Sequence, residues 1–264
     1  MSKAEYLQTA LKAAISAGNL IEERHKDILN ASRKESLRDI VTHVDKLAEN
    51  QIIDILKDYD KNIPILTEES GLVQGRTEKT YWIVDALDGT VNYVNHIPFY
   101  AVSIALFDKN KITVGVIFNP YSNELYYGSD GLGVFKNQKP LKIMDRIPEE
   151  CLFSMAFSGK NYEATKRVDE FLLFGKINDS SRGCLRTGSA AMNLAYLAEG
   201  KFGGCLGKAN KIWDVAAGLL LAKLAGSNVQ FKEVDKEKHL VNYIAAIPKA
   251  WNLLFSNIRG IYEV

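Results

Sequence analysis

The 264-residue sequence is poor in cysteine, proline and histidine, and it carries almost no net charge. Its three cysteines are widely spaced without a CxxC pair, a pattern typical of buried thiols in a reducing compartment. The histidines are dispersed and form no HExxH motif, so structural roles are favoured over zinc binding. Because 33 basic residues face 32 acidic ones, no global field draws the chain to nucleic acid. The cysteines are Cys151, Cys184 and Cys205.

The sequence also lacks any run of about 18 apolar residues, the length that a membrane-spanning helix needs. Its first 20 residues form an amphipathic, lysine-bearing pattern without the apolar centre of a secretion signal. We therefore expect a soluble cytoplasmic protein with no membrane partner. A length of 264 residues suits one large domain or two packed subdomains.

Hydrophobic spacing predicts different structures in the two halves of the chain. Apolar residues at helical spacing predict a helix from Ala4 to near Leu29 and another around 47–56, with a polar loop at 31–39 between them. Short β-like runs separated by turns then predict an antiparallel meander, after which strands alternate with helices. We interpret this change as two subdomains, residues 1–145 and 146–264. The predicted strands are 63–66, 81–84, 101–107, 112–118, 124–127, 152–156 and 202–206, and the later helices are 162–174, 188–199 and 213–225.

The most informative segment runs from Trp82 to Thr90, where an apolar strand leads directly into two aspartates and a Gly-Thr turn. A carboxylate at the end of a buried strand is costly unless a cation neutralises it. Asp85 and Asp88, with a carbonyl between them, offer the hard oxygen ligands that Mg²⁺ prefers. The backbone N–H groups of Gly89 and Thr90, at an expected helix start, favour an anion such as phosphate. Adjoining cation and anion sites are typical of metal-assisted phosphoryl transfer.

Two more acidic motifs accompany this segment, one upstream and one downstream. In order, the three motifs are Thr67-Glu68-Glu69-Ser70, Asp85-Ala86-Leu87-Asp88-Gly89-Thr90 and Trp213-Asp214-Val215-Ala216-Ala217-Gly218. Together they resemble the signatures of the inositol monophosphatase family of lithium-sensitive, Mg²⁺-dependent phosphatases. The resemblance covers nearly the whole chain, because Val41 to Asp45, Gly131 to Gly133 with Asn137, and Arg186 to Ala191 resemble further family positions. It implies a layered α+β fold, a five-layer αβαβα sandwich, and a homodimer.

The resemblance also implies roles for the matching residues. A first metal would be held by Glu68, Asp85 and the Leu87 carbonyl, and a second by Asp85, Asp88 and Asp214. Glu68 and Thr90 would activate the attacking water, and Asp45 would be a further catalytic or third-metal carboxylate. Two or three Mg²⁺ would bind in each active site, with Mn²⁺ as a substitute. A small phosphorylated metabolite would contact Asp88, Gly89, Thr90, Gly188, Ser189 and Asp214.

Simpler interpretations stand beside these roles. Asp88 and Asp214 could each be a helix N-cap, and Glu68 with Glu69 could form a solvated turn. Asp45 could be an exposed helix residue. The charged stretch from Lys34 to Asp39 is typical of an ordinary loop, although it matches the family's mobile active-site flap, with Lys34 as the residue closest to the metals.

Departures from the family pattern bear on the choice of substrate. Ala86 replaces the usual proline between the aspartates, and Gly207 replaces a glutamate that usually binds sugar hydroxyls. Lys201, Lys208 and Lys211 surround Gly207 without an acid, which predicts a pocket that tolerates a second anionic group. We expect hydrolysis of inositol monophosphate, with the 2′-phosphate of NADP(H) or fructose 1,6-bisphosphate as alternative substrates. An inactive metal or phosphometabolite sensor is the alternative from another class.

Overall fold

The computed structural model describes residues 2–30, 37–77, 79–158, 164–261 and 263–264. The helices of this part of the chain are α1 (Lys3–Asn30), α2 (Leu37–Tyr59), α3 (Thr90–Val94), α4 (Ala164–Asp179), α5 (Ala190–Ala198), α6 (Ile212–Ala225) and α7 (Pro248–Ile258), with one 3₁₀ turn at Pro148–Glu150. The strands are β1 (Ile65–Thr67), β2 (Gly71–Val73), β3 (Thr80–Asp88), β4 (Ala101–Asp108), β5 (Lys111–Asn119), β6 (Glu124–Ser129), β7 (Gly133–Lys136), β8 (Lys139–Pro140), β9 (Leu152–Ala156), β10 (Gly183–Leu185), β11 (Phe202–Lys211), β12 (Asn228–Asp235) and β13 (Leu240–Ala246).

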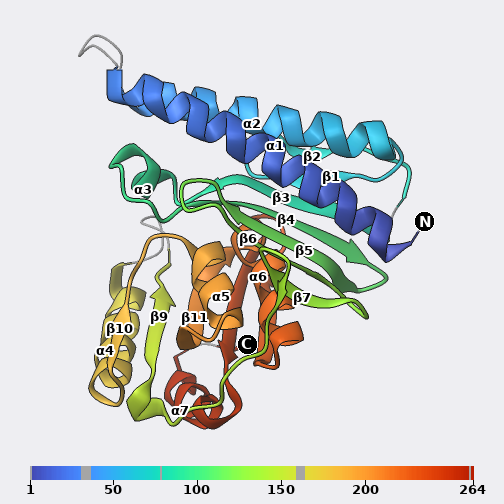
Figure 1. Ribbon diagram of the computed structural model, residues 1–264. Helices are drawn as coiled ribbons and strands as arrows, with labels where there is room; N and C mark the ends of the chain where they lie inside the picture. The colour runs from blue at the N-terminus through green and yellow to red at the C-terminus, as the bar shows by residue number, and fades with distance from the viewer. Residues whose placement is uncertain (1, 31–36, 78, 159–163, 262) are drawn as a thin grey trace.

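These elements stack in five layers, as the αβαβα expectation requires (Figure 1). The long helices α1 and α2 cover the outer face of a first sheet. Helices α5 and α6 pack between that sheet and a second one, and α4 and α7 cover the far face of the second sheet. The centre of the first sheet is therefore covered on both faces, which explains why β4 and β5 are largely apolar. None of the described helices combines the length and the apolarity that crossing a membrane would take.

The first sheet has the strand order β2-β1-β3-β4-β5-β6-β7-β8, and all its pairs are antiparallel except β1 with β3. The second has the order β10-β9-β11-β13-β12, in which β10, β9 and β11 are parallel and β13 pairs antiparallel with both β11 and β12. The first sheet ends at Pro140 and the second begins at Leu152. On this basis we propose the division of the chain near residue 145.

A β-bulge interrupts β3 where the two aspartates lie. Asp85 pairs with Ser103, whereas Asp88 pairs with Ala101, so three steps along β3 oppose two along β4. In a regular strand, residues three apart would point to opposite faces. The extra residue of the bulge changes that alternation, so the two carboxyl groups are not forced to opposite faces of the sheet.

The hydrophobic core forms on both sides of the first sheet and around the second. The three cysteines are buried and unpaired, as expected for core thiols. The meander was predicted correctly, but β3 is longer than its apolar run. In the second half the alternation of strands and helices was predicted, whereas β10, the antiparallel pair of β12 and β13, and α7 were not. Helix α2 begins at Leu37, so Arg38 and Asp39 belong to a helix rather than to the predicted loop, and Asp45 lies well past its first turns. Lys34 and Glu35, assigned to the flap, lie outside the described residues.

Candidate active site and metal centre

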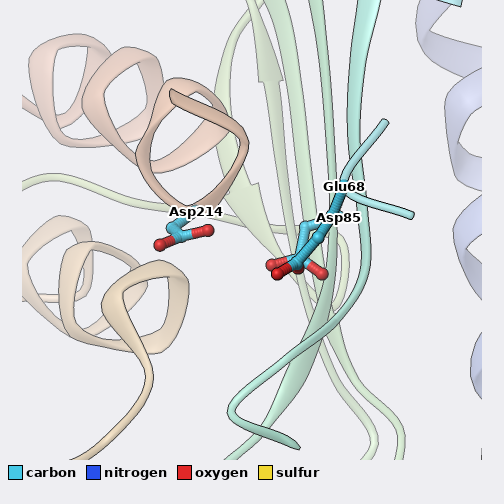
Figure 2. A group of neighbouring side chains, drawn as sticks. All are labelled: Glu68, Asp85 and Asp214. Atoms are coloured by element: carbon cyan, nitrogen blue, oxygen red, sulfur yellow. The ribbon is translucent and has the colours of Figure 1, made fainter. Parts of the chain in front are cut away.

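Three of the predicted acids meet at one point of the structure. Glu68, Asp85 and Asp214 each offer a carboxylate oxygen, and these oxygens all lie within 4.8 Å of one another. Figure 2 shows Glu68 and Asp85 side by side, with Asp214 facing them from the end of a helix. The cluster thus joins residues that are far apart in the sequence, from both halves of the chain.

Local structure explains why these three side chains converge. Strands β1 and β3 are parallel, and the register places Thr67 beside Val84, so the next residues lie side by side, Glu68 just beyond the end of β1 and Asp85 within β3. Asp214 arrives from the other half of the chain in the first turn of α6. The helix start is fixed because Ser103, the partner of Asp85 on β4, donates a hydrogen bond from Oγ to the Trp213 carbonyl at 3.0 Å.

Asp88 is held by the N-terminus of α5. Its Oδ2 accepts hydrogen bonds from Ser189 Oγ at 2.5 Å and from Ala191 N at 2.7 Å. Ser189 is the N-cap of this helix and is almost fully buried, so its hydroxyl is engaged by protein on both sides. The predicted substrate residue Ser189 therefore contacts the predicted ligand Asp88, and Asp88 connects the two halves of the chain.

The Gly-Thr turn follows directly. Gly89 has φ 93° and is the N-cap of α3, in which Thr90 is the first residue. Thr90 Oγ1 donates to the Leu87 carbonyl at 3.0 Å, and the Leu87 N–H donates to Asp85 Oδ1 at 2.9 Å. The peptide units between the two aspartates are therefore fixed by the same side chains that the family resemblance assigns to the site.

Asn92 is a residue that the sequence reading missed. Its Nδ2 donates to the carbonyls of Phe99 at 2.7 Å and Thr187 at 2.9 Å, which joins α3 to the turn before α5. Gly188 in that turn has φ 93°, and a Cβ there would meet Asn92 Oδ1 at 2.9 Å. The predicted residue Gly188 is thus required by backbone conformation and by the close approach of Asn92.

Buried charge dominates the electrostatics of the site. Desolvation raises the pKa of Asp85 and of Asp214 well above the ordinary value, and the neighbouring carboxylates raise both further. Partial burial and the charge of Asp88 raise the pKa of Glu68 to about 7. Burial also raises the pKa of Asp88, to about 6, against the hydrogen bonds from α5. Such a group of carboxyls favours either protons or a cation.

The donor set tests which cation fits. Every group in the cluster is a carboxylate oxygen, with no sulfur or imidazole among the described residues that form it. Hard oxygen donors suit Mg²⁺, Mn²⁺ or Ca²⁺ rather than zinc or copper. A divalent cation would also remove the mutual repulsion that raises these pKa values. The residues therefore fit a hard divalent metal.

Helix α2 adds two more buried acids. Asp45 is 7% exposed, and desolvation together with the charge of Glu68 raises its pKa to about 8. Asp45 is thus not an exposed helix residue, although it is outside the group of three. One turn later, Glu49 is 1% exposed and accepts hydrogen bonds from the backbone of Glu69 and Ser70. The Glu69 side chain itself is exposed.

The simple N-cap interpretation is wrong for both aspartates, because the N-cap of α3 is Gly89 and that of α6 is Lys211. Asp88 instead accepts from the N-terminus of another helix, and Asp214 lies inside the first turn of α6. The position of Asp88 is thus explained by its hydrogen bonds to the start of α5, and that of Asp214 by its approach to Glu68 and Asp85.

The predicted positive pocket is wrong for two of its three lysines. Lys201 forms ion pairs with Glu199 and Glu124, and Lys208 donates to the Ile261 carbonyl near the C-terminus. Only Lys211 acts on the cluster, where its charge lowers the pKa of Glu68 and Asp214.

Gly207 also leaves no open space for a substrate. A Cβ at Gly207 would lie 2.0 Å from Asn210 Oδ1 and 2.6 Å from Tyr243 Cε1. Asn210 therefore fills the volume beside the glycine, and its buried amide oxygen has no hydrogen-bond partner among the described residues.

Comparison with known proteins agrees with this geometry. The model of the inositol monophosphatase family matches residues 2–248. The chain belongs to the inositol monophosphatase family. Nus factor SuhB of Escherichia coli strain K12 is 36% identical over 259 residues, which are 96% of this chain and 95% of that protein. The Vibrio cholerae protein of the same name is 33% identical over 261 residues, again 96% of this chain and 95% of its relative.

Solved structures of the family have the same fold. The extragenic suppressor protein suhB from Bartonella henselae superposes with a TM-score of 0.83 at 30% identity, over 97% of this chain and 99% of that one. Inositol monophosphatase from Anabaena gives 0.82 at 28% identity, over 97% and 96%. The family match includes all the acids of the cluster, so the site lies within the region that defines inositol monophosphatases.

Proposed function

We propose that this protein is a Mg²⁺-dependent phosphomonoesterase that hydrolyses inositol monophosphate to inositol and phosphate. The observation that carries the proposal is the convergence of Glu68, Asp85 and Asp214 within 4.8 Å, directly beside the Gly89-Thr90 turn. Membership in the inositol monophosphatase family supports the same reaction.

The assigned residues divide the work of hydrolysis among them. Glu68, Asp85, Asp88, Asp214 and the Leu87 carbonyl would hold two or three Mg²⁺, or Mn²⁺ in their place. When bound, Mg²⁺ would neutralise phosphate charge and lower the pKa of an attacking water. Glu68 would accept the proton of that water, and the Thr90 hydroxyl would orient it, as the family resemblance implies.

The other residues would bind and orient the substrate. The Gly89 and Thr90 amides would bind phosphate oxygens. Asp214 would lie next to the leaving group, as would Gly188 and Ser189, which are located behind Asp88. Asp45, on α2, would add negative charge near the metal ligands and so raise the pKa of Asp85. Lys211 also donates from Nζ to a backbone carbonyl, that of Lys238 at 2.8 Å, so each of the three lysines is engaged by the protein, which favours inositol monophosphate over NADP(H) or fructose 1,6-bisphosphate.

Phosphate release from purified protein tests the proposal. We expect turnover of inositol monophosphate that requires Mg²⁺ and is inhibited by lithium and by Ca²⁺, whose larger and irregular shell misplaces the nucleophile. Asp85→Asn should keep the fold and lose at least about 10²-fold in kcat, since the Asp85 carboxylate would be a metal ligand and a neutral amide binds Mg²⁺ more weakly. Asp235→Asn, on the exposed edge strand β12, is the matched control and should behave as wild type.

The comparison of substrates distinguishes the remaining alternatives. Higher kcat/KM for NADP(H) or fructose 1,6-bisphosphate would replace inositol monophosphate as the substrate but keep the mechanism. Mg²⁺ binding without turnover of any of these phosphate esters would instead support the metal or phosphometabolite sensor.

The name of the relatives suggests a second function, that of a Nus factor. This function is favoured because the alignment with SuhB, at 36% identity, covers 96% of the chain. The similarity is therefore not confined to the residues of the site. Replacing SuhB in Escherichia coli by this chain tests it, with Asp85→Asn as the decisive variant. If the natural chain and Asp85→Asn complement equally well, the cellular role depends on the protein surface and not on the carboxylates of the site.

We also propose a cytoplasmic homodimer, as the family resemblance suggests. Light scattering coupled to gel filtration measures the mass directly. A species near 29.5 kDa would be a monomer and would remove this part of the proposal.

A further inference from the structure

A buried carboxylate outside the metal cluster binds the turn that carries Glu68. Glu49 lies on α2, is 1% exposed, and has no ion-pair partner among the described residues. Its Oε2 accepts a hydrogen bond from Glu69 N at 3.0 Å, and its Oε1 accepts one from Ser70 N at 3.0 Å. A buried acid with each oxygen occupied by a different backbone N–H is held in one orientation.

These two bonds fix the peptide unit next to Glu68. The N–H of Glu69 belongs to the same peptide plane as the Glu68 carbonyl, so its direction sets the backbone orientation of Glu68. The rest of the turn is closed by Thr67, whose Oγ1 accepts from Ser70 N at 3.2 Å and donates to the Gly71 carbonyl at 3.2 Å. The Glu68 carboxylate, exposed on one side, has no hydrogen bond of its own among the described residues that would aim it at Asp85.

The position of Glu49 couples this turn to the rest of the site. Asp45 precedes it by one helical turn, so both acids face the same way from α2. The charge of Glu49 raises the pKa of Glu68 and of Asp45, which places its carboxylate close to the cluster. An acid here adds repulsion to a site already rich in negative charge. The presence of an acid at this position is explained by its two carboxylate oxygens, each of which accepts a hydrogen bond from the turn.

We propose that Glu49 is a positioning residue that orients Glu68 toward Asp85 and so sets the affinity of the site for its metal. This inference rests on the proposed function, because it takes the cluster to be the Mg²⁺ site. Residues that orient metal ligands from behind change metal affinity or activity by about 10- to 100-fold when replaced.

Two substitutions separate positioning from charge. Glu49→Gln keeps the length of the side chain but supplies one acceptor where two N–H donors converge, so one bond is lost. Glu49→Asp keeps the charge but shortens the side chain by one methylene, so the fork no longer reaches the turn. Glu69→Gln, in the same turn with an exposed side chain, removes the same charge close to the cluster and is the matched control.

The measurement is Mg²⁺ binding to the full chain by calorimetry without substrate, together with the Mg²⁺ dependence of phosphate release. We expect both Glu49 variants to bind Mg²⁺ about 10-fold more weakly. The loss of kcat should be largely recovered at high Mg²⁺, whereas Glu69→Gln should stay within about threefold of wild type. Glu49→Asp, which keeps a buried acid, carries the test if Glu49→Gln does not fold.

Three results would overturn the inference. Wild-type Mg²⁺ affinity in folded Glu49 variants that have lost only thermal stability would make the residue purely structural. Wild-type affinity in Glu49→Asp, with equal losses in Glu49→Gln and Glu69→Gln, would reduce its role to charge. Unchanged affinity and stability in both Glu49 variants would remove it altogether. A wild-type protein that binds Mg²⁺ but releases no phosphate would instead refute the proposed function, while the calorimetry still decides the role of Glu49.

Discussion

Removing the charge of Asp45 should stabilise the metal-free protein, in a manner that depends on pH. Burial and the neighbouring acids raise the pKa of Asp45 from an ordinary 3.8 to about 8. At about 1.4 kcal/mol for each factor of ten in proton affinity, ionising Asp45 in the folded protein costs at most roughly 6 kcal/mol more than in the unfolded chain. Water and polar groups that reorient around the charge reduce this penalty, so we expect about 2–3 kcal/mol.

The sign of the pH dependence follows from proton binding. The unfolded chain releases the Asp45 proton near pH 4, whereas the folded protein retains it until about pH 8. Between these values the folded state binds more protons, so this group makes stability fall as pH rises. Asp45→Asn carries no proton to lose, and its advantage should therefore be small near pH 4 and greatest at pH 8 and above.

Calorimetric melting of protein treated with a chelator, at pH 5 and pH 8, measures the effect. For a chain of this size we expect Asp45→Asn to raise Tm at pH 8 by roughly 5–10 °C and by much less at pH 5. Saturating Mg²⁺ should narrow the gap, since the cation relieves the same repulsion in the wild type. An equal difference at both pH values, or a lower Tm for the variant at pH 8, would refute the reasoning.

Three other changes probe the rest of the site. Glu68→Gln should lose at least about 10²-fold in kcat at saturating Mg²⁺, and near-normal turnover would remove Glu68 from the catalytic group. Ser189→Ala should cost about 1 kcal/mol of stability as a lost N-cap. It should also move the acidic limb of the pH–rate profile upward, because the Ser189 hydroxyl lowers the pKa of Asp88; an unmoved limb contradicts this. Gly89→Ala, at φ 93° and with its Cβ 3.0 Å from a carbonyl oxygen, should lose about 1–3 kcal/mol in urea denaturation; wild-type stability would show that the turn relaxes.

The parts of the site that could be predicted from sequence are those in which chemistry and strand pattern coincide. Asp85 follows an apolar run, so its burial and its need for a cation were both readable from neighbouring residues. A helix start at the Gly-Thr turn was also predicted, and α3 begins at Thr90. The ordered acidic motifs then related Glu68 and Asp214 to Asp85, although only the parallel pairing of β1 with β3 and the Ser103 bond bring them together.

Other residues could not be found because their partners are distant in the sequence. Glu49 has the helical spacing of the buried residues Ile52 and Leu56, but its charge favours a surface position, and the backbone groups that bind it lie 20 and 21 positions away. Asn92 likewise depends on Thr187, at a separation of 95. The error over Lys201 has this origin only in part, since its partner Glu124 comes from another strand but its other partner, Glu199, is only two residues away in the sequence. Side-chain contacts between elements carry information that a local pattern does not contain.

The position of Asp214 has a consequence for the order in which the protein matures. Strands β1 and β3 emerge from the ribosome early, yet the third carboxylate arrives only after nearly 130 further residues. A nascent chain can therefore fold its first sheet and still possess no complete cation site. Acquisition of metal is deferred until α6 has docked, so a truncated or stalled product would lack the cluster and release no phosphate.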